Sequence, residues 1–231
     1  EMDFSGVDVL KLTTFFGSML LLVLPLWPLQ MLRGRGFREP FLVYICLLWF
    51  LSFFTGGLNF ASEISLDGVV YRFSLSSGIY TLIFAALLLV YVAEGINEAR
   101  KVIMISIGCQ IFLIAFQVFL YQARGTFLKE ADSAIVHQVL EPRVFNIGVS
   151  IFNTVLDLFL AVVLFQFLVN RLKRVPLSII MFSALWATMM LDSVIYVGLT
   201  RPGTFKNFLT GHIIFKTSLL VMMVFPLAFF I

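Results

Sequence analysis

The sequence has 231 residues, of which 61% are hydrophobic and 13% are charged, and its formal net charge is +3. This composition excludes a soluble globular domain, because apolar runs about twenty residues long recur along the chain and match the thickness of a bilayer. The positive charge does not indicate a nucleic-acid partner, since the basic residues cluster in short segments between the apolar runs. We therefore expect an all-α, polytopic membrane protein surrounded by membrane lipids.

Seven apolar runs predict seven transmembrane helices in a single domain covering residues 1–231. The first run contains Pro25 and Pro28, which predict a kink because proline removes a backbone donor from the helix. The expected helices cover residues 8–31, 41–60, 76–94, 101–122, 143–169, 177–199 and 208–231.

The charged residues predict how the chain is oriented in the membrane. The loops after the first, third and fifth helices hold eight basic and three acidic residues, whereas the N-terminal segment and the other loops hold seven basic and eight acidic residues. Because basic loops remain in the cytoplasm, we expect the N-terminus outside and the C-terminus in the cytoplasm. The chain lacks an initiator Met and ends in an apolar run at Ile231, so we expect the natural protein to continue into a cytoplasmic segment.

Asp192 and Lys216 lie in consecutive apolar helices, at similar distances from the short loop that joins them. At about 1.5 Å per residue, both lie roughly 10–12 Å from the same membrane face. A charge in hydrocarbon costs at least about 2.5–3.5 kcal/mol, so we expect this acid and base to be paired or to face a polar cavity. His212 lies one turn from Lys216 on the same helical face. Two interpretations stay open here, a structural ion pair that fixes the helix register and the wall of a ligand cavity.

A polar stripe marks the fifth predicted helix, which begins near Arg143. Asn146, Asn153 and Asp157 are spaced at i, i+7 and i+11 and therefore share one helical face, which is unlike a lipid-facing surface. We expect an outward-facing polar cavity among the last three helices. Its expected ligand-binding residues are Asn153, Asp157, Asp192, His212 and Lys216, with supporting roles for Arg143, Asn146 and Trp186.

Motifs of soluble enzymes are absent from the sequence, including nucleotide-binding loops, nucleophile elbows and paired-histidine zinc motifs. We therefore expect no enzymatic activity, no cofactor and no metal site. Cys46 and Cys109 lie inside apolar runs and are predicted to act as small hydrophobic residues rather than as a disulfide or metal pair. Gln110 and Gln117, seven residues apart, are expected to hydrogen bond to neighbouring helices.

The last helices carry a resemblance to a known family. The segments that carry it are 95–100 (Gly-Ile-Asn-Glu-Ala-Arg), Leu156-Asp157 after Arg143, 191–198 (Leu-Asp-Ser-Val-Ile-Tyr-Val-Gly), 211–219 (Gly-His-Ile-Ile-Phe-Lys-Thr-Ser-Leu) and Phe225-Pro226. Their order and spacing resemble the vitamin-uptake-transporter-like family, which includes bacterial queuosine-precursor transporters. The resemblance covers the second to seventh helices and implies a multi-pass protein of the bacterial cytoplasmic (inner) membrane.

The sequence departs from the transporter members of this family in three ways. It has no acidic residue in the segment 85–92, and Met189 stands where transporters tend to have Asn. It also has an additional first helix, which resembles the form of this membrane domain found ahead of diguanylate cyclase or histidine kinase modules. The resemblance therefore implies a sensory input domain for a cytoplasmic effector.

Three hypotheses for the function remain open on the sequence. The first is a sensor that recognises a small molecule in an intramembrane polar cavity and signals to a fused effector. The second is a secondary transporter for a small polar metabolite such as a queuosine precursor, and the third is a retinal protein with Lys216 as the attachment point and Asp192 and Trp186 in its pocket. The sequence leaves the ligand and the oligomeric state open, a homodimer included.

Overall fold

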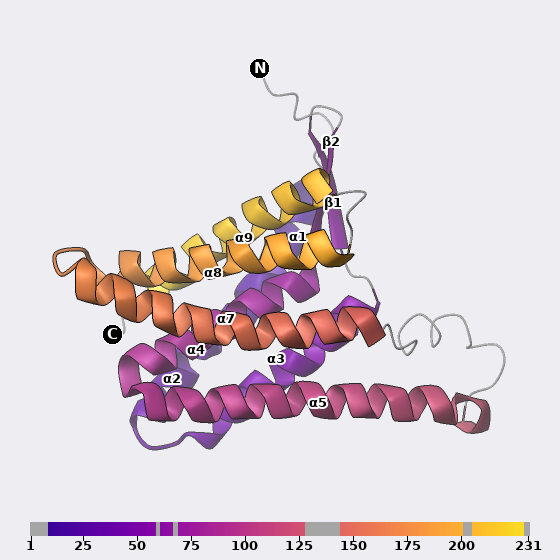
Figure 1. Cartoon of the computed structure of the whole chain (residues 1–231), viewed down its shortest axis with the longest axis horizontal. Helices are drawn as coiled ribbons and strands as arrows, with labels where there is room; N and C mark the ends of the chain where they lie inside the picture. Colours follow the sequence, from indigo (N-terminus) through magenta and orange to yellow (C-terminus); the bar gives the residue numbers. More distant parts are fainter. Residues whose placement is uncertain (1–8, 59–60, 67–68, 128–143, 201–204, 229–231) are drawn as a thin grey trace.

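A computed structural model describes residues 9–58, 61–66, 69–127, 144–200 and 205–228. Its helices run alongside one another, and a β-hairpin extends from one end of the bundle (Figure 1). The expected all-α membrane fold is confirmed. The helices are α1 (Val9–Val23), α2 (Leu26–Gly34), α3 (Glu39–Gly57), α4 (Leu75–Glu94), α5 (Ile96–Phe127), α7 (Val144–Arg171), α8 (Leu177–Thr200) and α9 (Phe205–Ala228).

The first predicted membrane helix is divided in two. Helix α1 ends at Val23 and α2 begins at Leu26, so the break falls at Pro25, as the sequence predicts. Leu24 still donates its backbone N–H to Leu20, and Leu29 donates to Pro25. The chain therefore bends at the proline while the hydrogen bonds on either side of it are retained.

Helix α4 is the inner helix of the bundle. Its segment 78–90 is buried except at Tyr80, and it contains no charged residue. A helix that is apolar on every face is stable only when other helices surround it, and α4 packs against α1, α3, α5, α7, α8 and α9. Gly78 permits the closest of these contacts, because a Cβ at this position would lie 2.6 Å from Met19 Sδ and 2.9 Å from Phe215 Cζ.

An antiparallel hairpin between α3 and α4 was not predicted from the sequence. Strand β1 (Ala61–Leu66) pairs with β2 (Val69–Ser74), and Glu63 lies opposite Arg72 in the register. Strand β2 packs against α9, and its last residue adjoins the first residue of α4. The hairpin therefore lies at the end of the bundle at which α4 and α9 begin.

Large apolar side chains cover the outside of the bundle. Leu21, Met104 and Phe159 are each more than two-thirds exposed. Within the described residues, six helices are long and apolar enough to cross a membrane, and a shorter apolar helix follows at Leu209–Val224. Such an apolar outer surface requires lipid around it, so the protein is a multi-pass membrane protein.

Candidate functional site

Lys216 and Asp192 form an ion pair between α9 and α8. Lys216 Nζ lies 2.5 Å from Asp192 Oδ2 and donates a second hydrogen bond to Ser193 Oγ at 2.9 Å. Lys216 is 2% exposed and Asp192 is 7% exposed. The low dielectric around these charges makes their pairing obligatory, because an isolated buried charge costs several kcal/mol.

Helix α7 adds an amide and a second carboxylate to this pair. Asn153 Nδ2 donates to Asp192 Oδ1 at 3.1 Å. Asp157, one turn further along α7, is fully buried and interacts electrostatically with both Asp192 and Lys216. The structure thus brings four of the predicted residues together. We name Asn153, Asp157, Asp192, Ser193 and Lys216 the Lys216 cluster.

Three residues that sequence reasoning did not assign to the site extend the Lys216 cluster. Tyr80 on α4 donates its hydroxyl hydrogen to Asp157 Oδ2 at 3.2 Å or to Thr154 Oγ1 at 3.1 Å. Gln110 on α5 donates to Thr154 Oγ1 at 2.9 Å, which confirms the predicted interhelical role of this amide. Tyr80 lies in a stretch without charges, so the sequence alone gave no signal that it faces Asp157. The polar contacts therefore connect α4, α5, α7, α8 and α9.

Several polar atoms in this region have no hydrogen-bond partner among the residues that the structure describes. They are Asp157 Oδ1, Asn153 Oδ1 and the indole Nε1 of Trp49. Asp157 and Asn153 are 0% and 1% exposed, and Trp49 is 5% exposed. The Trp49 ring packs edge-on against Tyr80, with 5.7 Å between the ring centroids. Buried polar atoms of native proteins are normally bonded, so these three are candidates for contacts with a ligand or water.

The other residues predicted for the site are His212, Trp186, Arg143 and Asn146. His212 is half-buried, one turn before Lys216 on α9. Trp186 is 39% exposed and donates its indole N–H to Thr217 Oγ1 at 2.9 Å. Arg143 lies outside the described residues, as does the side chain of Asn146.

A second group of charges, missed by sequence reasoning, joins the opposite end of α4 to α2 and α5. Arg33 is 2% exposed and donates to Glu94 Oε1 at 2.5 Å and to Glu98 Oε2 at 3.2 Å. Glu98 also pairs with Arg38 at 2.9 Å and with Lys101 at 2.7 Å. The sequence assigned these residues only to loops that set orientation. We name this group, composed of Arg33, Arg38, Glu94, Glu98 and Lys101, the Arg33 cluster.

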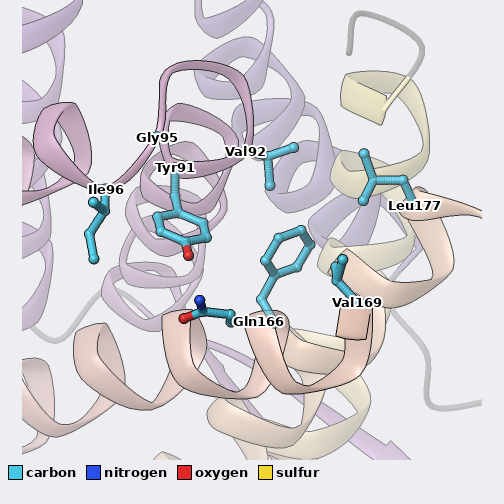
Figure 2. Close-up of a pocket in the computed structure, with 8 residues that line it drawn as sticks. Tyr91, Val92, Gly95, Ile96, Gln166, Val169 and Leu177 are labelled. Atoms are coloured by element: carbon cyan, nitrogen blue, oxygen red, sulfur yellow. The ribbon is translucent and has the colours of Figure 1, made fainter. Parts of the chain in front are cut away.

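A pocket of about 460 Å³ lies near this same end of α4. Figure 2 shows the Tyr91 hydroxyl and the Gln166 side chain facing each other, with apolar side chains around them. Tyr91 follows Tyr80 by eleven residues, a distance of about 16 Å along a helix. The pocket is therefore separate from the Lys216 cluster, where the sequence places the ligand cavity, and no charged side chain lines it.

The two cysteines lie next to each other in space. Cys109 Sγ on α5 lies 3.1 Å from Cys46 Sγ on α3, and both thiols are free. Their contact could not be inferred from a spacing of 63 residues.

Comparison with known proteins gives one match. The family model described as vitamin uptake-like sensor matches residues 26–231, from the first residue of α2 onward. No curated protein and no solved structure matches the chain. The family match includes both charged clusters and leaves out α1. Because it covers most of the sequence, the chain belongs to the vitamin uptake-like sensor family.

Proposed function

We propose that this protein is a sensory membrane domain that recognises a small molecule at the Lys216 cluster and signals to a cytoplasmic effector of the diguanylate cyclase or histidine kinase type. The observation that carries the proposal is the presence of unpartnered, fully buried acceptors on Asp157 and Asn153 beside a buried ion pair. Ionisable groups inside a membrane bundle are candidates for functional sites by default. The family match supports a sensor.

Helix α4 offers a route between the ligand site and the opposite membrane face. Tyr80 contacts Asp157 near the start of α4, and Glu94 contacts Arg33 at its end. A ligand that hydrogen bonds to Asp157 competes with the Tyr80 hydroxyl for this carboxyl group. Such a ligand shifts the packing of α4 only if it has different affinities for two arrangements of the bundle. In the proposed orientation in the bacterial inner membrane, the Arg33 cluster lies on the cytoplasmic side. A shift of α4 therefore reaches the side of the membrane on which the effector lies.

A chimera tests the proposed signalling. The chain is placed ahead of a diguanylate cyclase domain, and cyclic di-GMP is measured in cells with a fluorescent reporter. We expect Asp157→Asn to change the output at equal expression, whereas Glu39→Gln, the same acid-to-amide change at an exposed position, leaves it unchanged. Equal output from the wild type, Asp157→Asn and Glu39→Gln contradicts signalling through this site.

Transport is a second candidate, because the polar cluster lies well inside the helices, where transporters bind their substrates. Uptake of a radiolabelled queuosine precursor by a precursor-auxotrophic cell expressing the chain tests it. Uptake that is lost in Asp157→Asn favours transport over sensing. No observation on the described residues favours a retinal protein, since Lys216 Nζ is bonded to Asp192 and Ser193 and Trp186 is partly exposed.

A further inference from the structure

The pocket beside Tyr91 lies where four helices begin or end. Its lining comes from the last turn of α4, the α4–α5 turn, the last two turns of α7 and the first residue of α8. Membrane helices end near the boundary between hydrocarbon and lipid headgroups, so the pocket lies at about that depth. Ile96, Gln166 and Leu177 line it and are exposed, so the pocket opens to the outside of the bundle.

The lining of this pocket matches the part of a phospholipid at which the acyl chains join the glycerol. Its volume of about 460 Å³ is within the range of small-ligand sites, about 300–1,000 Å³. Most of its side chains are apolar, as an acyl chain requires. The Tyr91 hydroxyl and the Gln166 amide face each other among them (Figure 2), and both can donate hydrogen bonds to ester carbonyl oxygens.

A basic connection between α7 and α8 borders the pocket, because it joins two helix ends that line it. Arg171, Lys173 and Arg174 are all exposed there, and residues 158–176 contain no acidic side chain. Among the described residues, no carboxylate pairs with these three, whereas each cation of the Arg33 cluster has a carboxylate partner. The mouth of the pocket therefore carries positive charge that the described residues do not neutralise.

We propose that this pocket binds an anionic phospholipid of the surrounding bilayer, with an acyl chain between α4 and α7 and the phosphate at Lys173 and Arg174. Basic pockets between membrane helices bind anionic headgroups in this way. A zwitterionic lipid offers the same chains, but its amine is repelled by the basic connection, and free phosphate has nothing to fill the apolar pocket. The site is separate from the Lys216 cluster, so the inference goes beyond the proposed function and does not depend on it.

Three compounds test this inference on the whole chain in detergent: dioleoyl phosphatidylglycerol, dioleoyl phosphatidylcholine and glycerol 3-phosphate, which is an anionic headgroup without chains. Native mass spectrometry counts the lipid retained at each added concentration and gives an apparent Kd. We expect phosphatidylglycerol to bind about tenfold more tightly than phosphatidylcholine, because basic side chains near the membrane surface each attract an anionic headgroup. We expect glycerol 3-phosphate not to displace it.

Two variants locate the binding. We expect Lys173→Gln with Arg174→Gln to reduce phosphatidylglycerol binding to the level of phosphatidylcholine. The matched control, Arg35→Gln with Lys101→Gln, removes the same number of exposed charges elsewhere and should preserve the tenfold difference. Val92→Trp places a large ring in the pocket and should weaken the binding of both lipids, with the thermal unfolding midpoint showing that the variant is folded.

Four results would each overturn the inference. The first is equal binding of the two lipids to the wild type, and the second is displacement of phosphatidylglycerol by glycerol 3-phosphate, which would make the ligand a soluble phosphate. The third is an equal loss in the control pair, which would indicate general attraction to a basic surface. The fourth is undiminished binding to folded Val92→Trp, which would place the lipid outside the pocket. The comparison of lipids on the wild type requires no variant to fold.

Discussion

The two charged clusters at opposite ends of α4 differ in how their charges are satisfied. In the Lys216 cluster, a lysine and two carboxylates are all buried and two acceptor oxygens lack a partner among the described residues. In the Arg33 cluster, a buried arginine pairs with Glu94 and Glu98, and the other two partners of Glu98, Arg38 and Lys101, are 48% and 59% exposed. Of the two clusters, only the Arg33 cluster includes charged side chains that are exposed enough for water to solvate them.

This difference fits a structural role for the Arg33 cluster and the proposed binding role of the Lys216 cluster. Arg33 joins three helix ends at a position where the sharp α4–α5 turn requires Gly95 in a left-handed conformation, with φ of 88°. The Arg33 cluster holds three cations and two carboxylates, and all three cations have carboxylate partners. The Lys216 cluster has buried acceptors without a hydrogen-bond partner among the described residues, which is the basis of its proposed binding role. The following substitutions test this contrast.

Lys216→Met has the largest expected effect. It leaves two carboxylates in the bundle without their ammonium, and breaking a buried pair by removing one partner costs about 3–5 kcal/mol. We expect a large fall in the thermal unfolding midpoint, measured in detergent by circular dichroism. Lys206→Met, near the start of α9, is the control and should have little effect.

A double substitution sharpens this first prediction. Adding Asp192→Asn to Lys216→Met removes one of the two carboxylates that have lost their ammonium partner. We therefore expect part of the lost thermal stability to be regained. If Lys216→Met and Lys206→Met have equal, negligible effects, then the ion pair contributes nothing and the contrast between the two clusters fails.

Arg33→Gln is the next largest change. The substitution removes the buried guanidinium that bonds Glu94, and hydrogen bonds to charged groups contribute about 1.5–3 kcal/mol each. We expect destabilisation of about 2 kcal/mol, less than for Lys216→Met, because the carboxylates left behind can be reached by water. Arg35→Gln, at an exposed position on the same segment, should be neutral in the same unfolding assay. A larger loss for Arg33→Gln than for Lys216→Met reverses the ranking of the clusters.

Tyr80→Phe has a smaller expected effect. It removes the hydroxyl that joins Asp157 to Thr154 and keeps the ring that packs against Trp49. We expect a loss of about 1–2 kcal/mol from the unpaired acceptors. Tyr91→Phe on the same helix is the matched control, since its ring contact with Phe165 is retained. Equal stability of the two variants indicates that the Tyr80 hydroxyl does not stabilise the cluster.

The sequence predicted the membrane helices and the similar distances of Asp192 and Lys216 from the loop between them, because both predictions follow from local patterns. A run of about twenty apolar residues must span lipid, and the shared distance of Asp192 and Lys216 from one loop placed them together. The break at Pro25 followed from the missing backbone donor. These inferences require only residues close to one another in the chain or in consecutive helices.

Contacts between distant segments could not be predicted in this way. Arg33 is 61 residues from Glu94, Tyr80 is 77 residues from Asp157, and Cys46 is 63 residues from Cys109. An apolar helix such as α4 has no polar face to orient it, so the direction of Tyr80 depended on how the neighbouring helices pack. The hairpin was missed because its short strands lie between two much stronger helical signals.

Lys101→Gln should have the smallest effect of the four substitutions. Lys101 is 59% exposed and pairs with Glu98 three residues earlier on α5, a geometry in which attraction is weakened by water and salt. Glu98 keeps Arg33 and Arg38 as partners, so its charge remains balanced after the change. We expect no measurable shift of the unfolding midpoint at physiological salt, as for the exposed control Arg100→Gln. If Lys101→Gln clearly lowers the unfolding midpoint and the effect persists in high salt, then the outer charges of the Arg33 cluster act as one unit with its buried arginine. The distinction between buried and exposed members of this cluster is then wrong.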